Sequence, residues 1–336
     1  MGRRRLPGVA QTGREWRPLT ERDLPAWARL IGAIAVVDGA VEHLGEDDLR
    51  DELTASWHRP ELDTWVTEDD AGEALAFGHV DLRPSDTTLL RVRCWGGVRP
   101  DQRGRGLGRA VLARQLTRTR ELVADRRAVL GDPTVAARAM VSVLQGDVST
   151  GPLLARSGFA VARWSCVMRR DLSAPVPSVP DPGWASIRPF EPAWDDAVRE
   201  VHNQAFARHW GSQPLSPQTW SQLVTLGKRD FRPEWSLVAF DRLGVAGYLL
   251  SDAYRSEWEA LGYTQGFVSL VGVRPDRQRQ GLGAALLTHA MRVYREAGME
   301  YAGLDVDAEN TTGAVAVYAR LGFEILERTA QWTLEV

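Results

Sequence analysis

The chain has 336 residues, a length that suits two domains of ordinary size, each with a hydrophobic core of its own. With 44% hydrophobic and 25% charged residues it has a globular composition, and its formal net charge of −3 gives no general attraction to nucleic acid or to anionic membranes. No apolar stretch approaches the ~20 residues that span a bilayer, and no hydrophobic segment of a signal peptide follows the basic start, so we expect a disordered tail over residues 1–13 and a cytoplasmic protein.

In the first half, residues 14–172 form one predicted α/β domain. It opens with a short strand at residues 16–19 that contains a proline, followed by a helical stretch rich in acids. Cys94 and Cys166 fall on predicted strands of this half. They belong to no Cys-x-x-Cys pair or Cys/His cluster, so we expect buried free thiols and no metal site.

A linker and a second domain follow. Residues 173–183 contain four prolines and no apolar periodicity, which predicts a semi-extended linker. Residues 184–336 open as the first domain does, and their pattern alternates between the two kinds of element. The predicted strands are 187–190, 235–240, 244–250, 267–273 and 301–306, and the predicted helices run from about 281 to 298 and from 310 to 321. Strands that alternate with crossover helices predict a mixed α/β sheet.

The same motif occurs in both halves, each time after an apolar run. Residues 98–108 read Val-Arg-Pro-Asp-Gln-Arg-Gly-Arg-Gly-Leu-Gly, and residues 273–283 read Val-Arg-Pro-Asp-Arg-Gln-Arg-Gln-Gly-Leu-Gly. An internal repeat of this kind predicts two similar domains with the same device at the same place.

The second copy suits a diphosphate. A helix that begins near Gly281 presents free backbone N–H groups and the positive end of its dipole, and Gly281 and Gly283 leave that backbone approachable. A P-loop needs Gly-Lys-Ser/Thr, and the dinucleotide pattern Gly-x-Gly-x-x-Gly fails at Leu286, so both are excluded. The side chains expected to add mobile positive charge or hydrogen bonds are Arg277, Gln278, Arg279 and Gln280. The alternative is that the glycines only permit a tight turn.

Because Arg/Gln-x-x-Gly-x-Gly occurs twice, the chain resembles a tandem member of the GNAT superfamily of acetyl-CoA-dependent N-acetyltransferases over nearly its whole length. The resemblance implies, in each half, a six- or seven-stranded mixed sheet that splays open beside the motif strand, with helices on its faces. It also implies that the turn holds the coenzyme A pyrophosphate and that the strand backbone holds pantetheine and the thioester carbonyl. The residues so assigned in the second half are Val271, Val273, Gln278, Arg279, Gln280, Gly281, Gly283 and Asn310.

The second half also matches the superfamily pattern Asn-x7-Tyr-x3-Gly-Phe, with Asn310, Tyr318, Gly322 and Phe323. The resemblance implies that Asn310 contacts coenzyme A and that Tyr318 is the general acid for the departing thiolate. Two alternatives stay open. Asn310 would cap a helix without any ligand, and Tyr318 could be a core aromatic.

The first half departs from this pattern. Leu154 stands at the tyrosine position and Gly146 at the asparagine position. Residues 98 and 159 are 61 apart, whereas residues 273 and 323 are 50 apart, and we place an insertion around residues 131–133. We therefore expect the N-terminal domain to be catalytically degenerate and the C-terminal domain to be catalytic. A second coenzyme site stays open at Val98, Arg103, Gly104, Arg105, Gly106 and Gly108.

The two-domain plan is similar to that of mycothiol synthase, but the substrate contacts differ. In our alignment mycothiol synthases have a glutamate where this chain has Phe267, a lysine where it has Asp252 and a tyrosine where it has Asp305. We therefore expect another small-molecule amine that carries positive charge, such as a polyamine or an amino sugar. Asp305 and Asp252 are candidate contacts, although Asp252, Glu257 and Glu259 also fit a solvated loop before the motif strand.

The general base stays open among His202, His209 and Asp305. The sequence thus predicts an enzyme that moves an acetyl group from acetyl-CoA to a primary amine by direct attack in the C-terminal domain. A non-catalytic acyl-CoA-binding or regulatory protein is the alternative. We expect no nucleic-acid or membrane partner, and a monomer is plausible because a tandem repeat mimics a dimer.

Overall fold

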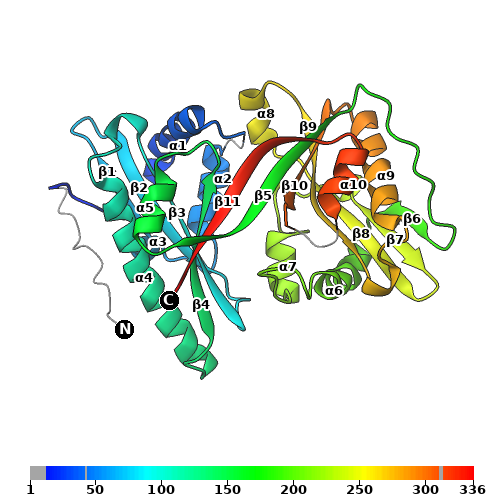
Figure 1. Ribbon diagram of the computed structural model, residues 1–336, viewed down its shortest axis with the longest axis horizontal. Coiled ribbons are helices and arrows are strands. Elements are labelled where there is room, and N and C mark those ends of the chain that lie inside the picture. The colour runs from blue at the N-terminus through cyan, green and yellow to red at the C-terminus, as the bar shows by residue number, and fades with distance from the viewer. Residues whose placement is uncertain (1–12, 42–43, 310–312) are drawn as a thin grey trace. The chain divides into compact units, whose positions relative to one another are not determined.

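A computed structural model describes residues 13–41, 44–309 and 313–336 (Figure 1). The chain divides into two compact units. Unit 1 comprises Met1–Trp164 and Thr329–Val336, and unit 2 comprises Ser165–Arg328. These bounds differ from the predicted domains because two long strands are divided between the units. Ala160–Asp171 (β5) begins in unit 1 and ends in unit 2, and Glu324–Glu335 (β11) begins in unit 2 and ends in unit 1.

Unit 1 is a mixed sheet with helices on its faces. Its strand order is β1-β2-β3-β4-β11, in which β3 and β4 are parallel and the other neighbours antiparallel. The strands besides β11 are Thr64–Glu68 (β1), Ala74–Leu82 (β2), Leu89–Val98 (β3) and Ala136–Leu144 (β4). The helices are Leu24–Asp38 (α1), Glu46–Thr54 (α2), Pro60–Asp63 (α3), Leu107–Leu130 (α4) and Thr150–Arg156 (α5).

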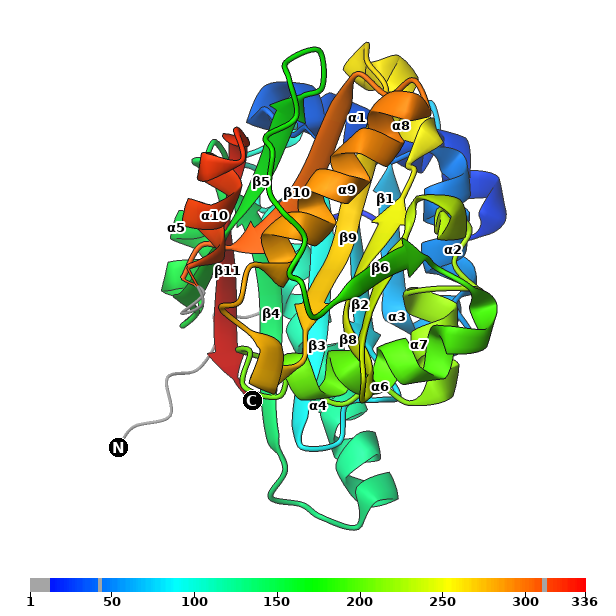
Figure 2. The same cartoon turned by 90° about the vertical axis from the view of Figure 1, so that its right-hand side faces the viewer.

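Unit 2 repeats this arrangement, with strand order β5-β10-β9-β8-β7-β6 and a parallel pair β9/β10. Figure 2 shows α9 running along β9 and β10, with α10 beside it. The strands besides β5 are Ser186–Pro189 (β6), Leu237–Asp241 (β7), Gly244–Asp252 (β8), Gln265–Val273 (β9) and Tyr301–Asp307 (β10). The helices are Asp195–Ala205 (α6), Pro217–Leu223 (α7), Arg255–Leu261 (α8), Leu282–Glu296 (α9) and Ala314–Arg320 (α10).

The mixed α/β class and most predicted elements of the second half are confirmed, and three local predictions are wrong. Residues 16–19 form no strand but a single bridge, Arg17 with Val66. Asp252 ends β8, and the residues after it form α8 rather than a loop. The extra length of the first half lies mainly in its motif helix, because α4 has 24 residues and α9 has 15.

Each sheet has one core on either face. In unit 2, α9 and α10 pack on one face with Val306 and Tyr318, and α6 and α7 pack on the other with Tyr248. The predicted free thiols are confirmed, since Cys94 and Cys166 are both buried and unpaired in a disulfide. They lie in the cores of unit 1 and unit 2 respectively.

The parallel strands part in both units, as the resemblance implied. β9 pairs with β10 only from residues 265–268 to residues 301–304, although β9 continues to Val273 and β10 to Asp307. In unit 1, β3 and β4 pair only over residues 89–93 and 136–140. The open stretch of β9 leads directly into the glycine turn.

A β-bulge marks the parting of β9 and β10 in unit 2. Leu250 pairs with Leu270 while the next residue, Ser251, pairs with Val268, so Ser269 is left without a partner of its own on β8. Bulges bend a strand and often lie beside active sites. The corresponding β2–β3 pairing in unit 1 runs without interruption from residues 76 and 98 to residues 82 and 92.

Candidate active site

The open stretch of β9 presents backbone groups to the gap between the parted strands. Arg274 N–H donates to the Ala246 carbonyl, so alternate residues of this antiparallel pair bond to β8. Val271 and Val273 are the intervening residues, and their N–H and C=O groups therefore point away from β8. The carbonyl of Val273 does accept from Gln278 Nε2 at 3.1 Å on that side.

The second glycine turn leaves open space over the start of α9. Gly281 precedes the helix with φ 85°, and a Cβ added at Gly281 or Gly283 would meet no described atom within 4 Å. Arg279 has φ 60°, the one non-glycine in the left-handed region among the described residues. The backbone N–H groups of this helix start are therefore approachable, as an anion site requires.

The arginines closest to β9 are structural. Arg274 bonds Asp241 and Asp276, both at 2.6 Å, and Arg277 bonds the same Asp241 oxygen at 2.8 Å. Burial opposes ionisation of Asp241, but the hydrogen bonds from Arg274 and Arg277 prevail and lower the pKa of its carboxyl. These contacts pin the β7–β8 hairpin to the glycine turn. Arg277 is therefore not the mobile cation expected from the sequence.

Of the four polar side chains expected at the turn, Arg279 is the one left for a ligand. Gln278 bonds the Val273 carbonyl, and Gln280 Nε2 bonds the Asp276 carbonyl at 3.1 Å. Arg279 is exposed, and in the described part of the chain no carboxylate pairs with it. A non-glycine residue is strained at positive φ, so the backbone here holds a cation outward at some energetic cost.

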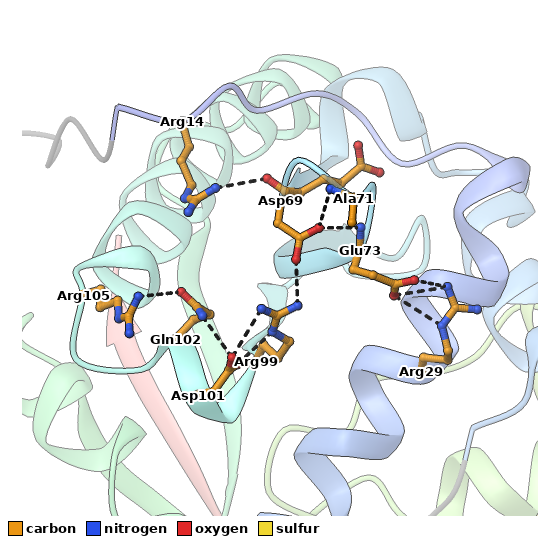
Figure 3. Close-up of polar contacts among 10 residues, drawn as sticks. Arg14, Arg29, Asp69, Ala71, Glu73, Arg99, Asp101, Gln102 and Arg105 are labelled. Carbon is orange, nitrogen blue, oxygen red and sulfur yellow. Dashed lines mark hydrogen bonds and ion pairs between the residues drawn. The ribbon is translucent and has the colours of Figure 1, made fainter.

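The first glycine turn has the same kind of arginine–carboxylate contacts to a neighbouring hairpin, here called the hairpin clip, and two further hydrogen bonds (Figure 3). Arg99 bonds Asp69 at 3.1 Å and Asp101 at 2.8 Å, as Arg274 does with its two carboxylates. Gln102 donates to Asp101 at 3.0 Å, and Arg105 donates to Gln102 at 3.1 Å. The repeated Val-Arg-Pro-Asp sequence is thus explained by a structural contact in both units.

Arg103 is held by the end of α1. Its two terminal nitrogens bond the two carboxylate oxygens of Asp38 at 2.7 and 2.8 Å, and these side chains are only 23% and 8% exposed. The backbone carbonyl of Asp38 also lies close to Gly146, because a Cβ there would be 2.7 Å from it. The Asp38 carboxylate thus neutralises Arg103, whereas Arg105 of the same turn is exposed and bonds the neutral Gln102.

Hydrocarbon side chains lie against the two elements that flank the first turn, whereas its own glycines are open: a Cβ at Gly104 would meet no described atom within 4 Å, and one at Gly106 only Arg109 at 3.6 Å. A Cβ at Gly97 would be 2.4 Å from Ile34 of α1, and a Cβ at Gly108 would be 3.3 Å from Leu153 of α5. Gly108 corresponds to Gly283, which faces open space. The two turns have the same backbone shape but different surroundings.

Tyr318 lies in the core of unit 2. Its side chain is 7% exposed and its ring meets Phe323 edge-on at 6.0 Å. Burial raises the pKa of its phenol to about 12, and within residues 13–41, 44–309 and 313–336 no hydrogen bond engages the hydroxyl. The helix begins at Ala314, preceded by Gly313, so the predicted cap Asn310 lies upstream of it and outside the described residues.

Leu154 of α5 has the corresponding place in unit 1. Phe159 N–H donates to the Leu154 carbonyl at 3.1 Å, and Phe323 N–H donates to the Tyr318 carbonyl at 3.0 Å. Leu154 is 1% exposed in its own core. The structures around the two positions therefore match while the side-chain chemistry differs.

Acidic side chains lie on β10 where it has left β9. Asp305 is exposed, yet the surrounding protein desolvates its carboxylate and raises the pKa to about 6, and the charges of Glu327 and Asp307 add to this effect. Two residues further, Asp307 Oδ2 is 3.7 Å from His209 Nε2. Asp305 and Asp307 share the face of β10 opposite to Leu304, which packs toward α9.

Two other predicted candidates belong to the interior. His202 is 6% exposed, its Nδ1 is 2.7 Å from the Tyr248 hydroxyl, and burial lowers its pKa to about 4. Asp252 is fully buried, is paired with Lys228, and accepts a hydrogen bond from Tyr254 at 2.9 Å. Asp252 is therefore not accessible to an acceptor amine in solution. It is the last residue of strand β8 and does not lie in a solvated loop.

Comparison with known proteins decides the family. Residues 196–323 match the model of the "Acetyltransferase (GNAT) family". A mycothiol acetyltransferase of Thermobispora bispora is 31% identical over 321 residues, covering 94% of this chain and 96% of that protein. This chain belongs to the GNAT acetyltransferase family. A second mycothiol acetyltransferase, from a Nocardioides species, is 29% identical over 310 residues.

Solved structures show the same tandem GNAT fold. A GCN5-related N-acetyltransferase from Sphaerobacter thermophilus superposes with a TM-score of 0.77 at 24% identity, over 98% of this chain and 97% of that one. A tandem GNAT protein from the clavulanic acid biosynthesis pathway superposes with a TM-score of 0.62 at 18% identity, over 96% of this chain and 98% of that one.

Among the described helices of this GNAT protein, none combines the length and apolarity needed to cross a membrane.

Sequence reasoning missed three residues that shape these sites. Asp38, Lys228 and Asp307 each lie outside the repeated motif, and each acts through a partner distant in sequence. For Asp307 a weak signal existed, since it follows Asp305 at the spacing of one strand face. No local pattern distinguishes Asp38 or Lys228 from an ordinary surface charge.

Proposed function

We propose that this GNAT protein transfers the acetyl group of acetyl-CoA to the primary amine of a small molecule, and that the reaction takes place in unit 2. The observation that carries the proposal is the open start of α9, over Gly281 and Gly283, at the end of a bulged strand that has parted from its neighbour. A bare, positively polarised helix start beside free strand backbone fits a diphosphate that continues into an extended arm.

The residues proposed to hold acetyl-CoA divide between the turn and the strand. The backbone N–H groups after Gly281 and the guanidinium of Arg279 would bind the pyrophosphate, while Gln278 and Gln280 brace the turn itself. The backbone groups of Val271 and Val273 would bind the pantetheine arm, and a strand N–H would polarise the thioester carbonyl. Coenzyme A supplies an activated acetyl group and a thiolate that can leave.

Tyr318 is proposed to protonate that thiolate. A phenol with a pKa of about 12 keeps its proton throughout the neutral and mildly alkaline range. Burial makes it a weaker acid than an ordinary tyrosine, but burial also makes a thiolate more basic, so the two groups stay matched in a dry site. Tyr318 would thus act first as a hydrogen-bond donor to sulfur and then as an acid.

The acceptor is proposed to be a cationic small-molecule amine. The curated relatives are named mycothiol acetyltransferases, which makes the unacetylated precursor of mycothiol one member of this class. Of the three positions at which our alignment departs from mycothiol synthases, Asp252 is buried against Lys228. Asp305 remains exposed where β10 has left β9, and its carboxylate would attract an ammonium group.

The test is release of free thiol from acetyl-CoA with a panel of amines. The panel contains amino sugars, polyamines and the unacetylated precursor of mycothiol, and mass spectrometry identifies the product. We expect amine-dependent thiol release with one acetyl group added per amine. Tight coenzyme binding without thiol release on any amine would overturn the proposal and favour a non-catalytic acyl-CoA-binding protein.

A further inference from the structure

We propose that His209, supported by Asp307, is the base that takes the proton from the acceptor ammonium; this inference rests on the function proposed for unit 2. An amine attacks a thioester only as the free base, and primary alkylamines are mostly protonated near neutral pH. The reaction therefore needs a group that accepts this proton near the gap between the parted strands β9 and β10.

The place of the pair suits this role. Asp307 is the last residue of β10, beyond the point where β10 stops pairing with β9. His209 lies in the turn after α6, where its N–H donates to the Phe206 carbonyl at 2.8 Å. The two side chains are 29% and 13% exposed, so a ligand can reach the imidazole while the carboxylate is largely shielded from water.

Aromatic contacts tie His209 to the motif strand. Its ring is 5.4 Å from that of Phe206, which stacks on His202 at 4.6 Å. His202 Nδ1 lies 2.7 Å from the hydroxyl of Tyr248, and Tyr248 fills the space beside Gly272, where a Cβ would be only 2.5 Å from its ring. Gly272 lies between the two valines proposed to bind the pantetheine arm. This series of contacts links His209 to β9, the strand that would present the thioester.

The electrostatics favour a protonated imidazole as product. Nε2 faces Asp307 at 3.7 Å, so with a hydrogen on Nε2 the other nitrogen, Nδ1, keeps a lone pair for the incoming proton. Asp307 shares one face of β10 with Asp305, which has Glu327 of β11 as a neighbouring charge, whereas His202 on α6 is buried and neutral. A carboxylate next to the imidazolium stabilises its charge.

The proton balance is then complete. The ammonium gives one proton to Nδ1 of His209, and the freed nitrogen lone pair forms the N–C bond as the C–S bond breaks. Tyr318 gives its proton to the sulfur. The second proton lost from nitrogen returns to Tyr318 through water, and His209 releases its proton to solvent, so the net products are the amide, the thiol and one proton.

The other candidates are less suited to the role. His202 has its ring inside the core, and Asp252 is already bound to Lys228 and Tyr254. Asp305 shares the face of Asp307 but has Glu327 as a neighbouring like charge, which suits it to attract a cation. His209 is left as the partly exposed imidazole beside the end of β10.

The experiment compares H209Q with the matched control H289Q. His289 on α9 forms a similar pair with Asp181 at 2.8 Å and is 32% exposed, but it contacts the linker rather than β10. The substrate is the alkylamine of the panel that the wild type acetylates best, and kcat/KM is measured as a function of pH. Gln keeps the size of the side chain but cannot accept a proton.

We expect H209Q to lose about 10²-fold in kcat/KM near neutral pH and to recover toward the wild type as the pH approaches the pKa of the amine, because solvent then removes the proton. D307N should lower the maximum of kcat/KM, since the imidazolium loses its counter-charge. H289Q should follow the wild type.

A second substrate separates catalysis from structure. Trifluoroethylamine is a primary amine that fluorine keeps unprotonated near neutral pH, so its attack needs no prior deprotonation, and H209Q should cost it much less than it costs the alkylamine. An unchanged pH profile in H209Q, or an equal loss at every pH, would overturn the inference while leaving the acetyltransferase intact. A wild type that acetylates no amine would instead overturn the proposed function.

Discussion

Tyr318 and Leu154 show how one side chain separates the two halves. Both residues are buried on a short helix. The backbone carbonyl of each accepts a hydrogen bond from the phenylalanine five residues later. Leucine fills its core with hydrocarbon, whereas tyrosine brings a hydroxyl that has no bonded partner among the described residues. A phenol can donate a proton to a ligand, which leucine cannot do.

Replacing Tyr318 by phenylalanine should therefore impair chemistry and spare binding. We expect kcat to fall by ~10²-fold, because a general acid contributes about that much. The dissociation constant of coenzyme A, measured by calorimetry, should stay nearly unchanged, and so should the melting temperature. Wild-type turnover in Y318F would remove the phenol from the mechanism.

Asp305 predicts a pH dependence of stability. Its pKa of about 6 in the folded protein lies above the ordinary value of 3.8. Folding therefore disfavours its ionised form, which costs stability at pH values above the folded pKa and costs none below the unfolded one. D305N should melt higher than the wild type at about pH 8 and equally at about pH 3. The reverse order would show that the carboxylate is stabilised by the fold.

At the scale of elements, the sequence predicted β7–β10 and α9 well because each has the hydrophobic period of its kind and a clear end, as at Gly298. It failed where the tertiary context decides. The polar stretch after Asp252 resembled a loop but forms α8, and a strand-like stretch at residues 16–19 makes only one bridge. The bulge at Ser269 arises from the register between β9 and β8, which the sequence of neither strand alone determines.

The site shows the same division. Gly281 and Tyr318 were found because motifs place them at fixed offsets. Arg277 and Asp252 were misjudged because their partners, Asp241 and Lys228, come from other elements and neutralise them. A motif predicts where a charged side chain lies, but not which side chain of opposite charge pairs with it.

The contact between α1 and the first glycine turn is proposed to be structural. We expect D38N to lower the free energy of unfolding by about 2 kcal/mol, because Arg103 would remain partly buried without a charge partner. Acetyl transfer should not change. Urea unfolding of D38N, R103Q and the double variant gives the coupling of the pair, and the double variant should lose less than the sum of the two single losses. Additive losses would contradict a direct contribution of this contact.

On the scale of the whole molecule, the repeat predicts two similar units, and the structure shows what repetition leaves free to change. Both units keep the hairpin clip, the parted parallel strands and the left-handed glycine before the motif helix. Only unit 2 combines a bulged motif strand, open glycines and a buried tyrosine. The exchanged ends of β5 and β11 were not predicted, because a strand pattern does not say which sheet it completes.

This asymmetry predicts one coenzyme per chain and can be tested with matched variants. Gly281 and Gly106 have φ of 85° and 89°, so a valine at either position meets the same backbone strain, about 1–2 kcal/mol. Any difference between G281V and G106V therefore reports on ligand access. Titration calorimetry should give one coenzyme A per wild-type chain, one for G106V and none for G281V.

Turnover should follow the same order, with G106V close to the wild type and G281V inactive at acetyl-CoA concentrations that saturate the wild type. The reason is that a side chain at 281 would fill the open space through which a diphosphate reaches the backbone, while in unit 1 Asp38 pairs with Arg103 and Leu153 lies against Gly108 at the start of the motif helix. Two coenzymes bound per wild-type chain, or one retained by G281V, would show that unit 1 opens to admit a ligand where α1 now lies.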